Sequence, residues 1–284
     1  MSGFFPPTRS KTLELLQHPA EKRGHSGFHE FQLVVTSFYF MKLHILGCGD
    51  AFGSGGRNNS SYLVDGGQRI FLLDCGPTTL PAMKRAGFSP RSLDAIFLSH
   101  LHGDHFGGLP FFFLEYLYES PRAKPLHVAG PPGTEERVRG LFQSMFGDAA
   151  EPKELPATVF HVLEPDRQVT VADVRVFPFR VPHQVRDISL GLKLSYQGKQ
   201  LLYSGDSAWT DVFLTHAQGT DLFLCECSFF DRETANHMNY RILQQNLPRL
   251  RCKRLILTHM GEEMLARRGE VSVELAEDGI VVEI

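Results

Sequence analysis

The pattern of hydrophobic and polar positions changes abruptly at Met41. From there, short apolar runs that end in glycine or aspartate alternate with amphipathic segments, a pattern typical of strands that alternate with helices. Strands are expected at Lys42–Leu46, Ser61–Val64, Arg69–Asp74, Ala95–Ser99, Leu126–Ala129, Thr158–Val162, Val169–Phe179, Leu190–Tyr196, Gln200–Ser204, Leu222–Glu226 and Arg254–Thr258. Helices are expected at Thr79–Ala86, Gly108–Tyr118, Glu135–Phe146, Trp209–Ala217, Asn236–Leu247 and Gly261–Arg267.

This order of elements predicts two mixed sheets with helices outside them. No linker rich in Pro, Gly or Ser divides the segment 41–284, so we interpret it as one α/β domain. Residues 1–40 differ in composition and in hydrophobic pattern: Phe4-Phe5-Pro6-Pro7 is followed by a polar stretch that has only a weak helical pattern. We interpret them as an N-terminal extension, appended to the domain or loosely ordered, because Met41 resembles a natural start.

Composition and charge exclude some classes of protein. The formal net charge is −3, so the chain lacks the global basic excess that grips a nucleic-acid backbone. No apolar stretch reaches the roughly 18–20 residues of a membrane span, and the start of the chain does not resemble a signal peptide. The five cysteines are an odd number in a long chain, which disfavours a disulfide framework and favours the reducing cytoplasm. Cys225 and Cys227 could form a soft metal site, but their apolar surroundings favour buried thiols.

The candidate chemistry is concentrated after one apolar strand, in the segment His100-Leu-His102-Gly-Asp104-His105. Side chains two apart in an extended chain project to the same side, so His100 and His102 can face one ion. Asp104 and His105 lie on the following turn and can face a second position. Imidazole and carboxylate ligands suit a borderline ion such as zinc.

This segment resembles the signature of the metallo-β-lactamase superfamily, and further motifs follow in that family's order. Phe71-Leu-Leu-Asp74 is similar to the early strand whose aspartate supports a ligand histidine. Val181-Pro-His183, Tyr203-Ser-Gly-Asp206 and Leu257-Thr-His259 resemble the later metal motifs. The resemblance covers almost everything from Met41 onward. It implies an α/β fold, a four-layer αββα sandwich of the metallo-β-lactamase fold, with the site along one edge.

The resemblance also implies the ligands and the reaction. Two Zn²⁺ ions per chain are expected, although Mn²⁺ or iron could occupy the same positions. A hydroxide that bridges the ions would attack the substrate, and Asp104 could hold it while acting as a ligand. One ion would be bound by His100, His102 and His183, the other by Asp104, His105 and His259, with Asp206 bridging.

Within the superfamily, the chain is most similar to the branch of phosphodiesterases that resemble tRNase Z. The glycine-rich segment 46–61 resembles that branch's N-terminal loop, so Arg57, Asn59 and Ser60 are candidate phosphate-binding residues. A flexible loop without a ligand is the alternative. Glu226 and the downstream His237 resemble the branch's pair in which histidine donates a proton to the leaving oxygen. A structural histidine at a helix N-terminus is the alternative for His237.

One departure from tRNase Z affects the expected substrate. In tRNase Z a long arm that grips tRNA is inserted between the third histidine and the bridging aspartate, whereas only 22 residues separate His183 from Asp206 here. We therefore expect a phosphodiester substrate that is either an RNA 3′ end or a small, cyclic molecule. Hydrolysis of a lactone or other carboxylic ester is the first alternative, and a non-catalytic metal-binding or cofactor-assembly protein is the second. No membrane partner is expected, and the branch leaves a homodimer open.

Overall fold

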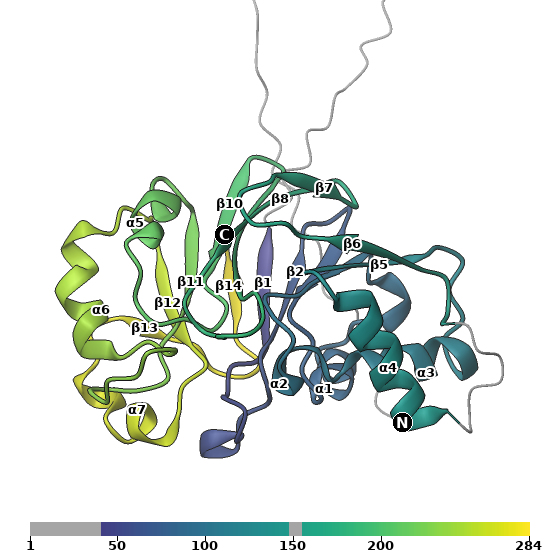
Figure 1. Cartoon of the computed structure of the whole chain (residues 1–284), viewed down its shortest axis with the longest axis horizontal. Coiled ribbons are helices and arrows are strands. Elements are labelled where there is room, and N and C mark those ends of the chain that lie inside the picture. The colour runs from purple at the N-terminus through teal and green to yellow at the C-terminus, as the bar shows by residue number, and fades with distance from the viewer. Residues whose placement is uncertain (1–40, 148–154) are drawn as a thin grey trace, which may run out of the picture. The chain divides into compact units, whose positions relative to one another are not determined.

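The computed structural model describes residues 41–147 and 155–284. The predicted N-terminal extension, residues 1–40, lies outside the described residues, so its attachment stays a prediction. The described residues form two sheets that pack face to face, with helices on both outer faces (Figure 1). This arrangement is the predicted αββα sandwich.

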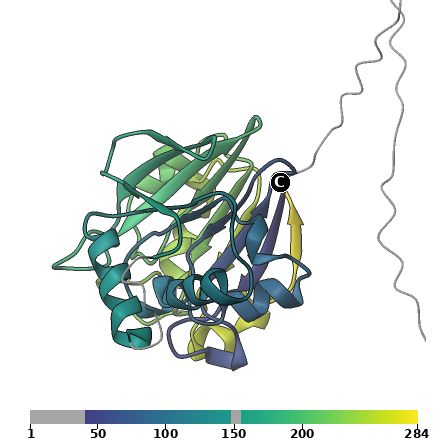
Figure 2. The ribbon, with the colours of Figure 1, turned by 90° about the vertical axis from the view of Figure 1, so that its right-hand side faces the viewer.

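The first sheet has seven strands in the order β14-β1-β2-β3-β4-β5-β6. β1 to β3 run antiparallel, and β3 to β6 run parallel. The last strand returns to pair with the first, so both ends of the described chain lie at one edge (Figure 2). The strands are β1 (Lys42–Gly47), β2 (Ser61–Asp65), β3 (Ile70–Leu73), β4 (Ala95–Phe97), β5 (Leu126–Gly130), β6 (Thr158–Val162) and β14 (Val281–Glu283).

The second sheet has seven strands in the order β13-β12-β11-β10-β9-β8-β7. β10, β11, β12 and β13 run parallel, and their carboxyl ends therefore meet at one edge. The strands are β7 (Val169–Val171), β8 (Val174–Arg180), β9 (Leu190–Tyr196), β10 (Lys199–Tyr203), β11 (Leu222–Glu226), β12 (Leu255–Thr258) and β13 (Glu274–Leu275).

The helices cover the two outer faces, four over the first sheet and three over the second among the described residues (Figure 1). They are α1 (Thr79–Arg85), α2 (Gly103–Phe106), α3 (Leu109–Tyr118), α4 (Thr134–Phe146), α5 (Val212–Ala217), α6 (Tyr240–Asn246) and α7 (Glu262–Ala266). No helix within the described ranges is long and apolar enough to cross a bilayer.

Three apolar clusters hold the layers together. The inner cluster lies between the sheets and includes Tyr62, Phe97 and Leu192. The alternate side chains of the same strands point outward, and they pack beneath the helices of each outer face. Cys225 and Cys227 are buried in the outer cluster of the second sheet, as expected for thiols that act as small apolar side chains.

Several predicted elements need correction. The predicted strand Val169–Phe179 is a hairpin, because Ala172 and Asp173 take the left-handed backbone conformation and reverse the chain. The predicted helix at Asn236 begins only at Tyr240, where the Asn239 side chain caps the first turn. The pattern missed α2, β13 and β14, which are too short to show a hydrophobic period.

Candidate metal centre

The functional motifs all follow strands that end at the same side of the sandwich. His100 comes three residues after β4, and Asp206, Glu226 and His259 come at or just after the ends of β10, β11 and β12. Because parallel strands present their carboxyl ends at one edge, residues far apart in sequence converge there. The topology thus brings together side chains that the sequence separates by up to 159 residues.

The structure groups the predicted ligands into two clusters. In each cluster the candidate ligand atoms lie within 4.8 Å of one another. The first, called here the imidazole cluster, contains His100, His102 and His183. The second, called here the carboxylate cluster, contains Asp104, His105, Asp206 and His259.

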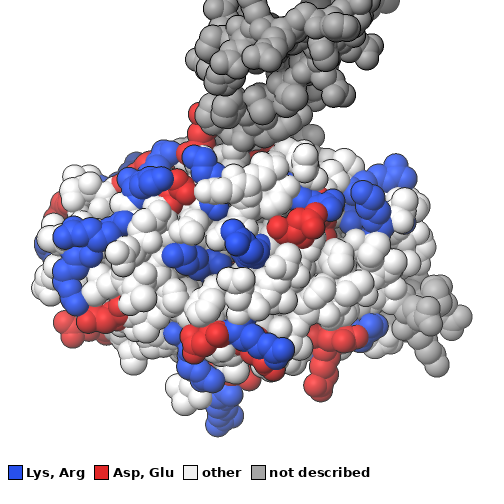
Figure 3. All heavy atoms as spheres, turned by 90° about the horizontal axis from the view of Figure 1, so that it is seen from above, with Lys and Arg blue, Asp and Glu red and all other residues white. Residues whose placement is uncertain are grey.

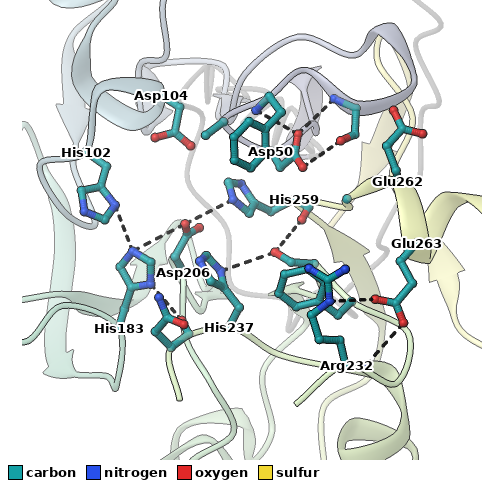
Figure 4. Close-up of a pocket in the computed structure, with 17 residues that line it drawn as sticks. Asp50, His102, Asp104, His183, Asp206, Arg232, His237, His259, Glu262 and Glu263 are labelled. Atoms are coloured by element: carbon teal, nitrogen blue, oxygen red, sulfur yellow. Dashed lines mark hydrogen bonds and ion pairs between the residues drawn. The ribbon is translucent and has the colours of Figure 1, made fainter. Parts of the chain in front are cut away.

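Asp206 lies between the two clusters (Figure 4). One of its carboxylate oxygens is 3.2 Å from His259 Nε2 and 3.8 Å from His183 Nε2, and the other is 3.3 Å from His105 Nε2. Burial disfavours the charge of Asp206, but His105 and His259 hold its pKa well below the ordinary value. The Asp206 carboxylate is therefore charged and reaches both clusters.

The chain's own residues fit a pair of metal ions. His100 Nε2, His105 Nε2 and Asp206 Oδ1 are buried, yet none has a hydrogen-bond partner among the described residues. Buried polar atoms without partners are costly, and here they converge on one another. Imidazole nitrogen with carboxylate oxygen is a donor set that zinc and similar ions favour.

Outer partners orient the candidate ligands. Asp74 accepts hydrogen bonds from His105 Nδ1 at 2.7 Å and from the Tyr203 hydroxyl at 2.6 Å. His183 Nδ1 lies 2.8 Å from the Asn236 carbonyl oxygen. Asp74 and His259 both take positive φ angles, 55° and 56°, which is uncommon for residues with a side chain and points to constrained functional positions.

Each candidate phosphate-binding residue of the glycine-rich loop has a partner within the protein. The Arg57 guanidinium pairs with Glu277 at 2.9 Å, and the Ser60 hydroxyl lies 2.9 Å from His259 Nδ1. Asn59 donates to the Asp50 carbonyl oxygen at 3.4 Å. None of these three residues lines the pocket above the metal centre. Instead the loop contributes Asp50, Ala51, Phe52 and Ser54 to that pocket.

The buried Glu226 and the half-buried His237 form a pair beside the two clusters. The carboxylate of Glu226 is fixed by the backbone N–H groups of Ser207 and Met238 and by the Ser228 hydroxyl. Its other contact is a short hydrogen bond to His237 Nδ1. Burial opposes the imidazolium, but the Glu226 carboxylate raises the pKa of His237 to about 9. His237 is thus protonated at neutral pH and faces the pocket.

The sequence analysis did not identify several residues that the structure places at the site. Tyr203, Ser99 and Asn236 all contact ligands or their supports, but a tyrosine at the end of a strand or a single asparagine in a loop is uninformative alone. Phe229 and Arg232 also line the pocket, and the guanidinium stacks 4.8 Å from the ring centroid. The exposed Phe52 stands on the glycine-rich loop, where only its position beside the pocket indicates a role.

Comparison with known proteins gives the relatives of this chain. The ribonuclease Z of Methanothermobacter thermautotrophicus is 29% identical over 285 aligned positions, which cover 83% of this chain and 91% of the relative. The ribonuclease Z of Clostridium acetobutylicum is 31% identical, but that match covers 55% of this chain and only half of the relative's length. These relatives confirm the predicted resemblance to the tRNase Z-like branch, and together with the probable metallo-hydrolase YhfI of Bacillus subtilis, which is 24% identical over 230 residues, they confirm the prediction of a metal-dependent hydrolase.

The fold is shared with solved structures. The metallo-β-lactamase fold protein YhfI from Bacillus subtilis superposes with a TM-score of 0.69 at 23% identity, covering 86% of this chain and 99% of that protein. This similarity confirms the predicted fold class. A family model described as anti-Pycsar protein Apyc1 matches residues 41–279. The chain therefore belongs to the Apyc1 family of anti-Pycsar proteins.

Proposed function

We propose that the protein is a dinuclear zinc phosphodiesterase. The observation that carries this proposal is the position of Asp206, whose buried carboxylate reaches the histidines of both clusters. A carboxylate shared between two ligand sets is what a pair of closely spaced ions requires. The ribonuclease Z relatives support the choice of a phosphodiester as the bond that is cleaved.

The ions and the chain have separate tasks in this reaction. When bound, two divalent ions lower the pKa of the attacking water and neutralise charge on the phosphoryl oxygens. The half-buried Asp104 faces the pocket and can accept a hydrogen bond that orients this water. His237, held protonated by Glu226, donates its proton to the leaving oxygen. Glu226 acts through His237, as its positioning residue.

The pocket supports a small substrate in preference to an RNA 3′ end. Its volume is about 400 Å³, which is within the range of small-molecule sites. The 22 residues between His183 and Asp206 form only a loop and the hairpin of β9 and β10, with no room for a tRNA-binding arm. On the face seen in Figure 3, which lies opposite the end of the sandwich that carries α7 (Figure 1), basic side chains are interspersed with acidic and uncharged ones.

The substrate class we propose is therefore a small phosphodiester, cyclic phosphodiesters included. The reducing cytoplasm is the compartment that fits five free cysteines. A homodimer is the assembly that the tRNase Z-like branch suggests, and light scattering on the purified chain measures it directly.

The test is hydrolysis of bis(p-nitrophenyl) phosphate by the purified protein, with its metal content measured in the same sample. We expect about two ions per chain and turnover that disappears in Asp206→Ala. Cyclic nucleotides and a short RNA are then compared as substrates. Two ions without turnover of any phosphodiester would refute the proposed reaction, and turnover of a lactone in that sample would establish the ester alternative.

A further inference from the structure

A chain of buried hydrogen bonds connects the two clusters on the side away from the pocket. His100 Nδ1 lies 3.0 Å from the Ser99 hydroxyl oxygen, and that oxygen lies 2.8 Å from Oδ2 of Asp74. The same Oδ2 lies 2.7 Å from His105 Nδ1. All four residues are fully buried, so water cannot substitute for any of these contacts.

The direction of each hydrogen bond follows from the chemistry of the groups. The Asp74 carboxylate also receives the Ser99 backbone N–H at 2.7 Å and the Tyr203 hydroxyl at 2.6 Å, so it acts as an acceptor throughout. Ser99 has one hydroxyl proton, and it points to Asp74. Towards His100 the Ser99 oxygen can therefore only accept, which places the proton of His100 on Nδ1.

The same reasoning places a proton on Nδ1 of His105, because a carboxylate cannot donate to it. Both rings then direct Nε2 away from Asp74. These Nε2 atoms are the ones that are buried without a hydrogen-bond partner among the described residues, and they belong to different clusters. The arrangement leaves Nε2 of each ring to bind its ion.

We propose that Ser99 and Asp74 form one positioning pair that fixes the tautomer of a ligand histidine in each cluster and so couples the two ion sites. Two of the other three ligand histidines have separate supports: His183 contacts the Asn236 carbonyl, and His259 contacts Ser60. Gly205, immediately before Asp206, packs against Ser99, since a Cβ added there would lie 2.8 Å from Ser99 Cβ. Ser99 is thus held in place from both sides.

The first test measures the tautomers directly. Long-range ¹⁵N–¹H NMR spectra of the full chain, stripped of metal, distinguish Nδ1-protonated from Nε2-protonated imidazole. We expect the Nδ1-protonated form for His100, whose ring is the one that Ser99 contacts. Finding the Nε2-protonated form for His100 in the unmodified protein would overturn the proposal, and this result requires no variant to fold.

The second test measures coupling through metal affinity. Ser99→Ala removes the hydroxyl, and Ser60→Ala is the matched control, because Ser60 is an equally buried serine that supports one ligand of the carboxylate cluster. In competition with a chromophoric chelator, we expect both binding steps to weaken by roughly 10- to 100-fold in Ser99→Ala. In Ser60→Ala we expect one step to weaken.

The coupling would be refuted if Ser99→Ala changed the metal affinity of only one binding step. It would also be refuted if both variants weakened both steps equally. The inference rests on the proposed dinuclear centre, but its failure is distinguishable from failure of that centre. If the unmodified chain bound no metal, the proposed function would fail while the tautomers remained readable. If the unmodified chain bound two ions and Ser99→Ala bound them with the same affinity, the proposed function would stand and the coupling would be refuted.

Discussion

The two ligand clusters differ in charge and in exposure, although one aspartate serves both. The imidazole cluster contains three histidines and no carboxylate of its own, and His102 is exposed. The carboxylate cluster contains Asp104 and Asp206 in addition to two histidines, and three of its four members are buried. A divalent ion gains more Coulomb energy beside two carboxylates than beside three imidazoles, and burial reduces screening of that gain. We therefore expect the carboxylate cluster to bind its ion more tightly.

The largest effect should come from the residue that belongs to both clusters. Asp206→Ala leaves His100, His105 and His259 without their shared counter-charge. We expect turnover to fall by more than the ~10⁴-fold upper limit that is typical of losing a general acid, together with loss of metal. Elemental analysis and phosphodiesterase assays measure both. Asp187→Ala removes an exposed carboxylate paired with Arg137 and serves as the control. Retention of two ions by Asp206→Ala would contradict a shared ligand.

The third candidate cluster sharpens the comparison, since Asp206 and His259 also lie near Glu226 and His237. If His237 is the acid and not a ligand, His237→Ala keeps both ions and loses turnover by ~10²- to 10⁴-fold. The loss should be larger for alkyl phosphodiesters than for p-nitrophenyl ones, because p-nitrophenolate leaves without a proton. His216→Ala is the matched control, because His216 lies on α5 and does not line the pocket. A drop in metal content in His237→Ala would make it a ligand instead.

The raised pKa of His237 gives the acid a predictable pH range. A group whose pKa in the folded protein is about 9 stays protonated below that pH and loses its proton as the pH rises through it. We expect kcat to fall on the alkaline side near this value. Glu226→Gln removes the charge that raises the pKa, so the fall should move to lower pH. An alkaline limb at the same pH in both proteins would argue against this pair.

The sequence predicted more of the candidate metal ligands than of the residues that orient them. Spacing alone brought His100, His102, Asp104 and His105 together, because they follow one strand. His183, Asp206 and His259 required the family's motif order, since no local pattern indicates that their strands end at one edge. The sequence did not predict the supporting roles of Ser99 and Tyr203, because a hydroxyl group can donate to a carboxylate only when the fold brings the two together. Arg57 was predicted to bind phosphate by resemblance, and no local pattern indicated its ion-pair partner Glu277, which comes 220 residues later.

The difference between the clusters can be tested by the order in which the ions leave. We expect a chelator to remove the ion of the imidazole cluster first, with affinities that differ by at least a factor of ~10, equivalent to about 1.4 kcal/mol. His102→Ala should weaken only the first ion to leave. Stepwise chelator titration with elemental analysis measures the order. Loss of the tighter ion in His102→Ala would reverse the assignment.

The smallest effect on catalysis is expected from the glycine-rich loop. The Arg57 side chain is 9% exposed and paired with Glu277, and its position outside the pocket separates it from substrate. Arg57→Met keeps the packing of the side chain and removes its charge, so we expect KM for a small phosphodiester to change by less than about threefold, or ~0.6 kcal/mol. The melting temperature should fall slightly, because Glu277 loses its partner. Arg232→Met is the informative counterpart, since Arg232 lines the pocket. A large rise in KM in Arg57→Met, with none in Arg232→Met, would indicate that the glycine-rich loop binds the phosphate group of the substrate.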